Sequence, residues 1–368
     1  MFTHRERFHR IFNFEPIDRI PMYYFGTWGE TKQRWIREGY EGPYTPTGDH
    51  HPLLPGMDPD WEGSLWNVQG LVRLNAIGDC GSGVLEETDD YRIVRDALGK
   101  VNMYSKKGST PPHTLEYPLK PTRESWKNFR RWLDPNLPGR YPADMAERAK
   151  ELNEKDCVTC FMGGALYNWV RDYMGVEELS YLMYDDPILL EEIVEELTDH
   201  FMTLMKPVLQ VTKFDFVYFF EDCCGSNGPL FSPAIYRQIY DRYYRKLIGF
   251  YKENGVPLAL IDSDGWVEPL VPCWLESGFD IMFPVEVGKW GAGPAEMRRK
   301  FGDRLRMFGG VNKFILKESP DTVRAYLTEL KKETDKGGYI PIPDHRIPPE
   351  ISLKQMQTYV EIFHEVFG

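Results

Sequence analysis

The chain has 368 residues and a formal net charge of −12, with 44 Lys and Arg against 56 Asp and Glu. This acidic balance, without a basic stripe, argues against nucleic acid as the main partner. No apolar run is long enough to cross a bilayer, and the first residues, MFTHRERFHRIF, lack the apolar centre of a signal peptide. We therefore expect a cytoplasmic protein that binds neither nucleic acid nor membrane.

The first 140 residues contain few regular elements. Thr3 and Glu6 stand at capping-box spacing, which predicts a short N-terminal helix. The apolar run RIPMYYF (19–25) is a candidate first strand. Residues 40–140 then contain a Pro/Gly-rich stretch and a predicted strand pair with its turn at Leu98–Gly99. We interpret this region as a cap or insertion over the rest of the chain.

A regular alternation of apolar runs and helical segments begins at about residue 156. Asp186 and Pro187, for example, predict the start of a long helix. The apolar runs are CVTCFMGG, FDFVYFF, PLALI, FDIMFPVEV, RLRMFGG and GGYIPIPDH. Strands that are almost entirely apolar and separated by helices indicate a parallel sheet buried on both faces.

Together with residues 19–25 these runs give seven candidate strands. That number favours an α/β fold of the (β/α)8 TIM-type barrel over a doubly wound sheet. No G-x-G-x-x-G follows the first strand, so a dinucleotide-binding fold has little support. We predict one barrel domain over residues 1–368, with residues 40–140 as its cap.

Polar side chains follow several of the predicted strands. In a barrel of this kind the active site forms where the carboxyl ends of the strands meet. Asp262 and Asp264 are two residues apart, so both can face the same cavity. A hydrated rim position explains Glu286 or Asp344 taken alone, and His345 fits a structural or a functional role equally well. The residues that we expect at this mouth are Glu221, Asp222, Asp262, Asp264, Glu286, Asp344 and His345.

Two kinds of chemistry suit these side chains, and the residues alone do not decide between them. Asp262, Asp264 and His345 could bind a divalent metal such as zinc, which would polarise an oxygen. Alternatively, a carboxyl group with a raised pKa could act as a general acid toward a leaving oxygen. The candidate catalytic residues are Glu221, Asp222, Asp262, Asp264 and His345.

Three long stretches resemble the uroporphyrinogen decarboxylase superfamily. They are RERFHRIFNFEPIDRIPM near the start, FMGGALYNWVRDYMG in the middle, and LESGFDIMFPVEVG with FGDRLRMFGGVNKFIL later. The resemblance implies a (β/α)8 barrel with its site at the C-terminal mouth. The superfamily also contains two chemistries, so the resemblance does not by itself define the reaction.

The chain departs from the decarboxylase branch just after the first predicted strand. True uroporphyrinogen decarboxylases bind a polyacidic porphyrinogen through arginines in a segment similar to MRQAGRYLPEYR. Here the equivalent stretch is FGTWGETKQRW (25–35), in which only Arg34 remains. Without those cations the carboxylates of a porphyrinogen would meet an acidic mouth, which argues strongly against that activity.

The other branch consists of methyltransferases that move a methyl group between a small substrate and a corrinoid. Its coenzyme M enzymes hold zinc through a His-x-Cys-Gly strand end and a later cysteine. LALIDSDGW (258–266) falls at that strand end, with Asp262 and Asp264 in place of histidine and cysteine. The later cysteine falls near Asp344 and His345. The resemblance therefore implies that the thiol-activating site is absent.

What remains is similar to the O-demethylase type of corrinoid-dependent methyltransferase. We expect transfer of a methyl group from a small methyl ether to a corrinoid (cobalamin) on a separate carrier protein. A methoxylated aromatic substrate would suit the candidate binding residues Trp28, Tyr167, Trp169, Trp266 and Glu286, although core packing explains any one of the aromatic residues as well. The alternatives are a decarboxylase or lyase of a small acid and a non-catalytic small-molecule binding protein. A homodimer and a bound divalent metal remain open.

Overall fold

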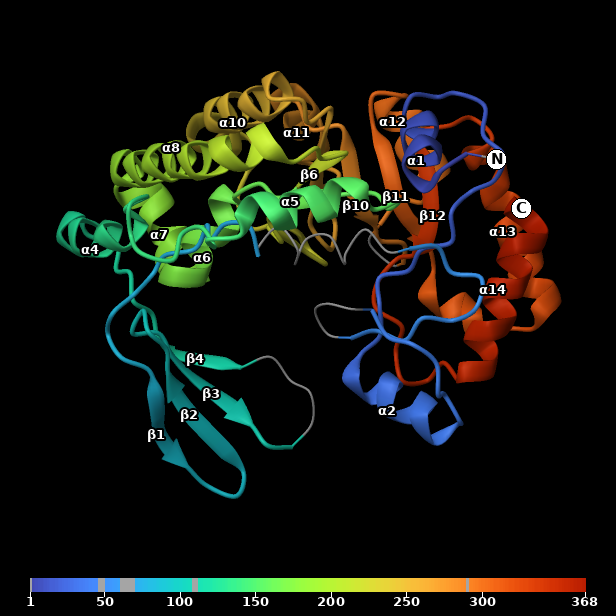
Figure 1. Ribbon diagram of the computed structural model, residues 1–368, viewed down its shortest axis with the longest axis horizontal. Coiled ribbons are helices and arrows are strands. Elements are labelled where there is room, and N and C mark those ends of the chain that lie inside the picture. The colour runs from blue at the N-terminus through green and yellow to red at the C-terminus, as the bar shows by residue number, and fades with distance from the viewer. Residues whose placement is uncertain (1, 46–49, 60–69, 108–111, 289–290) are drawn as a thin grey trace.

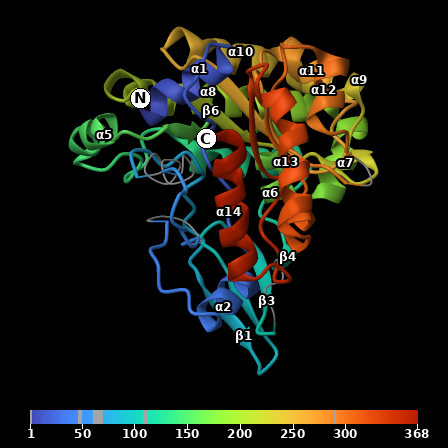
Figure 2. The same cartoon turned by 90° about the vertical axis from the view of Figure 1, so that its right-hand side faces the viewer.

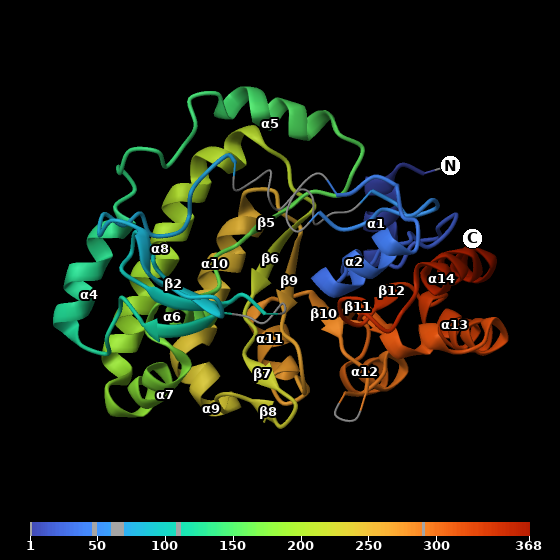
Figure 3. The ribbon, with the colours of Figure 1, turned by 90° about the horizontal axis from the view of Figure 1, so that it is seen from below.

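The computed structural model describes residues 2–45, 50–59, 70–107, 112–288 and 291–368. Within this part of the chain, six parallel strands form the central sheet in the order β12-β11-β10-β9-β6-β5 (Figure 3). All six apolar runs predicted after residue 156 are confirmed as these strands. Their bounds are β5 Cys160–Met162, β6 Phe216–Phe220, β9 Leu258–Asp262, β10 Ile281–Val285, β11 Arg306–Val311 and β12 Tyr339–Pro343.

Helices connect the strands and cover the outer face of the sheet (Figure 1). They are α6 Leu166–Met174, α7 Val176–Asp185, α8 Pro187–Val211, α10 Asp241–Glu253, α11 Val271–Ser277, α12 Pro294–Phe301, α13 Pro320–Thr334 and α14 Leu353–Phe367. As predicted, Pro187 begins α8 and the Asp186 carboxylate accepts from the Leu189 N–H. None of the described helices is long and apolar enough to cross a membrane.

The alternation of side chains along each strand produces two apolar clusters. On β6, Phe216 and Tyr218 face the barrel interior, while Val217 and Phe219 pack in the layer under the helices. The helix α1 (His4–Phe12), formed with the predicted Thr3–Glu6 capping box, packs Phe8 on Phe216 with ring centroids 5.5 Å apart. The arrangement is a TIM-type barrel whose interior is filled with side chains.

Residues 19–25 are not a seventh ladder strand. They run extended beside the β12 edge, where a single parallel bridge joins Thr27 to Ile347. Pro21 has no N–H to donate, and both backbone groups of Met22 bond to Asp58 instead of a strand. The side chain of Met22 is nevertheless fully buried in the interior cluster. The apolar pattern therefore predicted the burial correctly but not the hydrogen bonding.

Four strands within residues 83–107 and 112–116 form a separate antiparallel sheet, of order β1-β2-β3-β4, that extends from the body on the side of α6 and α7 (Figures 1 and 2). The predicted hairpin is confirmed, because the Asp96 carboxylate accepts from the Leu98 and Lys100 N–H groups between β2 and β3. That residues 40–140 cap a single domain stays a prediction. The bounds are β1 Gly83–Glu87, β2 Tyr91–Arg95, β3 Val101–Ser105 and β4 His113–Glu116, with helices α2 Gly29–Arg37, α4 Arg123–Phe129 and α5 Met145–Glu154 nearby in sequence.

Candidate active site at the barrel mouth

Asp264 and His345 meet at the C-terminal ends of β9 and β12. The His345 Nε2 lies 3.4 Å from the Asp264 Oδ2, and both side chains are partly exposed. The other oxygen, Oδ1, is buried and has no hydrogen-bond partner among the described residues. His345 also stacks on the Trp28 ring, with centroids 5.6 Å apart. The strand-end rule therefore placed two residues distant in sequence in one polar pair.

Asp262 lies deeper in the barrel. It continues the interior register of Leu258 and Leu260, is 2% exposed, and accepts a hydrogen bond from the Tyr218 hydroxyl. Its backbone carbonyl accepts from the N–H groups of Glu221 and Asp222. Asp262 thus lies below the Asp264–His345 pair, and its backbone carbonyl ties the ends of β6 and β9 together.

Glu221 points away from the mouth, toward the helices. Its carboxylate accepts from the N–H groups of Leu166, Tyr167 and Asn168, at 2.9, 3.0 and 3.1 Å, and from the Tyr244 hydroxyl. Burial raises the pKa of Glu221 to about 8, against the opposing effect of the three N–H groups. The geometry gives Glu221 the task of fixing the N-terminus of α6, whereas its position at a strand end predicted a catalytic role at the mouth.

Asp222 is held in an unusual conformation by Arg171. Its φ of 40° lies in the left-handed region that few side chains other than glycine adopt. Arg171 donates to the Asp222 carbonyl at 2.5 Å and to its Oδ2 at 3.0 Å. Burial raises the pKa of Asp222, the Arg171 charge opposes the rise, and the Asp264 charge adds to it. Strain of this kind, maintained by specific contacts, is typical of functional loops.

Glu286 and Asp344 lie on either side of Lys313. The Lys313 Nζ lies 3.8 Å from Glu286 and 3.5 Å from Asp344, while Glu286 also accepts from the Gly265 N–H at 2.9 Å. Asp344 is fully buried, and its burial raises its pKa. Glu286 therefore stabilises the turn after β9, which places Asp264, and its role in substrate binding stays a prediction.

A cavity of about 530 Å³ opens beside this mouth, at the ends of β5 and β6. Trp169 lines it, as do Met162 and Phe220 from the two strand ends and residues 72–75 from the predicted insertion. Its wall combines apolar with polar side chains, and its volume lies in the range of small-molecule pockets.

The other predicted aromatic residues fall in different places. Trp28 and Trp266 are 36% and 39% exposed, and Trp266 packs beside Gly228 on the hairpin β7 (Cys224–Gly225) to β8 (Gly228–Pro229). Tyr167 is 2% exposed and packs on Phe231, so it belongs to the core and does not line the cavity. The packing alternative is the better description of Tyr167.

Metal binding at the mouth remains a prediction. Among the described residues, no group of three or more His, Cys, Asp or Glu side chains is arranged to hold a metal ion. Asp264 and His345 offer two metal-ligating groups, whereas the Asp262 carboxylate accepts a hydrogen bond from the Tyr218 hydroxyl. Two protein ligands are fewer than a zinc site ordinarily uses, so we derive no step through a metal.

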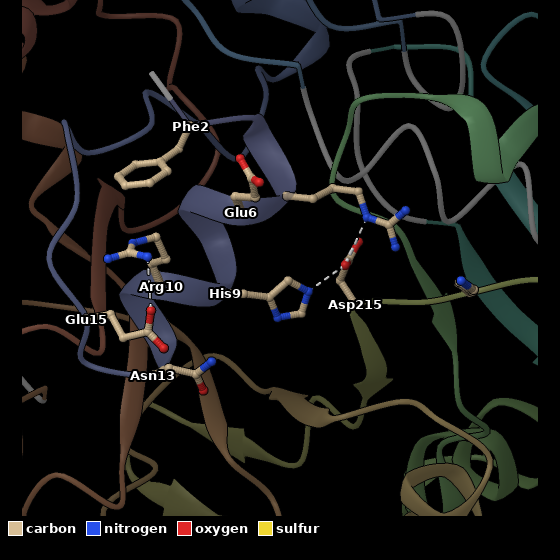
Figure 4. Close-up of a pocket in the computed structure, with 9 residues that line it drawn as sticks. Phe2, Glu6, His9, Arg10, Asn13, Glu15 and Asp215 are labelled. Atoms are coloured by element: carbon tan, nitrogen blue, oxygen red, sulfur yellow. Dashed lines mark hydrogen bonds and ion pairs between the residues drawn. The ribbon is translucent and has the colours of Figure 1, made fainter.

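Another pocket, of about 480 Å³, lies at the opposite end of the barrel, beside α1 (Figure 4). There the Asp215 carboxylate accepts from Arg5 at 3.1 Å and pairs with His9 at 2.7 Å. Asp215 directly precedes β6, so this pocket is at the N-terminal face, where polar residues ordinarily serve stability.

The strand-end rule did not predict several residues that lie at or near the mouth. Tyr218 stands two residues before Phe220, so the period-2 register of FDFVYFF could have placed it inside the barrel. Asn168, Arg171 and Lys313 belong to segments that follow the strands. Their roles depend on how α6 and the segment after β11 pack, for which the sequence offers no local signal.

The parallel sheet, its covering helices and the polar mouth define the chain as an α/β barrel of the TIM type. The profile of the family described as uroporphyrinogen decarboxylase (URO-D) matches residues 90–366, and the chain belongs to this family.

The chain is 24% identical over 197 residues to the uroporphyrinogen decarboxylase of Pseudomonas fluorescens, covering 50% of each chain. It is 23% identical over 196 residues to that of Hydrogenovibrio crunogenus, covering 51% of this chain and 52% of the relative. The matches therefore span about half the length of these curated relatives. A methyltransferase from Methanosarcina mazei has the same fold, with a TM-score of 0.58, 16% identity, and 99% of both chains covered.

Proposed function

We propose that this chain is a methyltransferase that moves a methyl group from a small methyl ether to a corrinoid carried by a separate protein. A methoxylated aromatic compound is the substrate class that we favour. The observation that carries the proposal is the Asp264–His345 pair, with 3.4 Å between Oδ2 and Nε2, at a mouth that adjoins a cavity with apolar side chains in its wall. Such a pair can deliver a proton to an oxygen that leaves as an alcohol or phenol.

The chemistry of ether cleavage explains why an acid pair is needed. The bond between the ether oxygen and the methyl carbon breaks, and its electron pair stays on the oxygen. Protonated His345, held by the Asp264 carboxylate, can give that oxygen its proton as the bond breaks. The reduced corrinoid supplies the electron pair that forms the new bond to the methyl carbon. Carboxylates and an imidazole suit this reaction better than they suit the activation of a thiol.

A decarboxylase of a small acid on the same barrel is the alternative, since the curated relatives are named as uroporphyrinogen decarboxylases. The charges at the mouth disfavour a polycarboxylate substrate. Arg34, the arginine left in the stretch 25–35, lies on α2 and donates to the Glu38 carboxylate and to the Pro349 carbonyl. A binding protein without catalysis ranks third, because the acid pair and the cavity are both present.

The test supplies cob(I)alamin, free and bound to a purified corrinoid carrier, together with a panel of methyl ethers. We expect formation of methylcobalamin, followed by its absorbance, with at least one methoxylated aromatic compound. The absence of methyl transfer across the panel, together with release of CO2 from a small acid, would replace the proposal with the decarboxylase. Metal analysis of the purified protein tests whether a divalent ion accompanies Asp264 and His345.

A further inference from the structure

Asn168 is a polar residue of the cavity beside the mouth, and its neighbours fix the orientation of its side chain. Asn168 is the third residue of α6, is 6% exposed, and lines the cavity. Its backbone N–H donates to Glu221 at 3.1 Å, which anchors it at the helix N-terminus. A buried amide must hydrogen-bond through both of its ends, or one end is left to bind something else.

Arg171 determines which end of the Asn168 amide faces it. Arg171 donates to the Asn168 Oδ1 and, with the same guanidinium group, to Asp222. A guanidinium group has donors only, so the amide atom that faces it must be the oxygen. The Nδ2 amino group is therefore the end that remains, and it has no hydrogen-bond partner within the part of the chain that the structure describes.

The rest of the cavity wall limits the charge of a ligand. Arg73 and Asp172 both line it and carry opposite formal charges, and the other polar groups are Asn75 and the indole N–H of Trp169. Apolar contacts come from Val72, Leu74, Met162, Phe201 and Phe220. A wall without net charge suits a neutral ligand that has an apolar ring.

We infer that Asn168 is a specificity-determining residue: its Nδ2 donates to a neutral carbonyl-type oxygen on a ligand whose ring fills this cavity. Arg171 is the positioning residue that orients the amide, and it also holds Asp222 beside the acid pair. As a statement about the methyl donor, this inference rests on the proposed function and adds to it a ring substituent with an acceptor oxygen. The binding site itself is independent of any reaction.

Two isosteric ligands and one isosteric variant test the inference. 4-Methoxyacetophenone has a carbonyl oxygen where 4-isopropenylanisole has a CH2 group of similar shape. Asn168→Asp retains an oxygen toward Arg171, as an ion pair, but replaces the donor with an acceptor. Binding of both ligands to wild type and variant is measured by calorimetry without any corrinoid, and circular dichroism verifies that the variant is folded.

We expect wild type to bind the ketone about ten- to a hundredfold more tightly than the alkene, the value of one hydrogen bond from a buried donor that is otherwise left without an acceptor. In Asn168→Asp this preference should disappear or reverse, because an acceptor faces the carbonyl oxygen. Asn168→Leu, which lacks both amide groups, should also lose the preference while still binding the alkene. Arg171→Lys should weaken it, since an ammonium group cannot hold both the amide and Asp222 in one plane.

Equal affinity of wild type for the two ligands, or no binding of either, would overturn the inference. A ketone preference that survives in Asn168→Asp would assign the recognition to another residue and would overturn it too. These outcomes are separate from those of the proposed function. A preference that depends on Asn168 without methyl transfer to cob(I)alamin would leave the inference standing and reject the methyltransferase. Methyl transfer at an equal rate in wild type and Asn168→Asp would support the methyltransferase and reject the role of Asn168.

Discussion

The two ends of β6 carry carboxylates that are treated in opposite ways. At the N-terminal end, Asp215 is 2% exposed and receives Arg5, His9 and the Thr159 N–H and hydroxyl groups. Burial alone would raise its pKa, but the hydrogen bonds from His9 and Thr159 and the charge of Arg5 lower it. Every partner is fixed, and the backbone needs no unusual conformation there.

At the C-terminal end of β6, the backbone of Asp222 is strained, and the carboxylates of Asp222 and Asp264 lie near each other. Asp222 has a φ of 40°, and burial raises its pKa despite the Arg171 contact. Nearby, the Asp264 Oδ1 has no partner among the described residues. The comparison shows that the hydrogen-bonding capacity of Asp215 is used at the N-terminal end, whereas Asp222 is strained and one oxygen of Asp264 is left without a partner at the C-terminal end, where chemistry can take place.

The largest expected effect is on activity at the incomplete end. Asp264→Asn keeps the side-chain size but removes the charge that stabilises protonated His345. We expect methyl transfer to fall by about 10²- to 10⁴-fold, the usual contribution of a general acid. The thermal midpoint should stay nearly unchanged, because Asp264 is about one-third exposed and its 3.4 Å separation from His345 is long for an ion pair, so the pair contributes little to stability.

Asp199→Asn is the matched control for this change. Asp199 is an exposed carboxylate on α8 whose ion-pair partner is Lys246 on α10, not a residue of the mouth. It should leave both rate and midpoint as in wild type. Full activity in Asp264→Asn would remove the acid pair from the mechanism. A large loss of stability would instead make the pair structural.

The second expected effect is a pH dependence of stability at Glu221. Its pKa is raised to about 8 in the folded chain, from 4.5. The folded state therefore binds more protons than the unfolded state between these values, and stability must fall as the pH rises through this window. The slope from this one group approaches about 1.4 kcal/mol per pH unit.

Glu221→Gln does not titrate, so denaturant unfolding from pH 5 to pH 8 should show a flatter profile for the variant than for wild type. Parallel profiles would mean that the carboxylate is already ionised, held by the N–H groups of Leu166, Tyr167 and Asn168. Glu221→Ala should lower the thermal midpoint, because it leaves those buried N–H groups without an acceptor.

The strands of the barrel could be predicted from the sequence, whereas the side-chain contacts of the site could be predicted only in part, for a physical reason. Continuous apolar runs such as Phe216–Phe220 are a local signal, and the rule that strand ends of a parallel barrel meet is topological, so they predicted six strands and the meeting of Asp264 with His345. The run 19–25 misled because its hydrogen bonding is decided by Asp58, far along the chain. Whether Glu221 faces the mouth or α6 depends on the packing of that helix, which no local pattern encodes.

The smallest expected effect tests the saturated end. Asp215→Asn should lower the free energy of unfolding at pH 7 by about 2–3 kcal/mol, since it weakens charge-assisted hydrogen bonds to Arg5 and His9, which are themselves partly exposed. Because the folded pKa lies below 3.8, wild type keeps this advantage above that value and loses it as the pH falls further. The two unfolding curves should therefore converge below about pH 4, the reverse of the dependence at Glu221. Methyl-transfer rates measured well below the thermal midpoint should be equal in variant and wild type. A loss of rate at unchanged stability would show that the pocket beside α1 takes part in function, and the contrast between the two ends of β6 would fail.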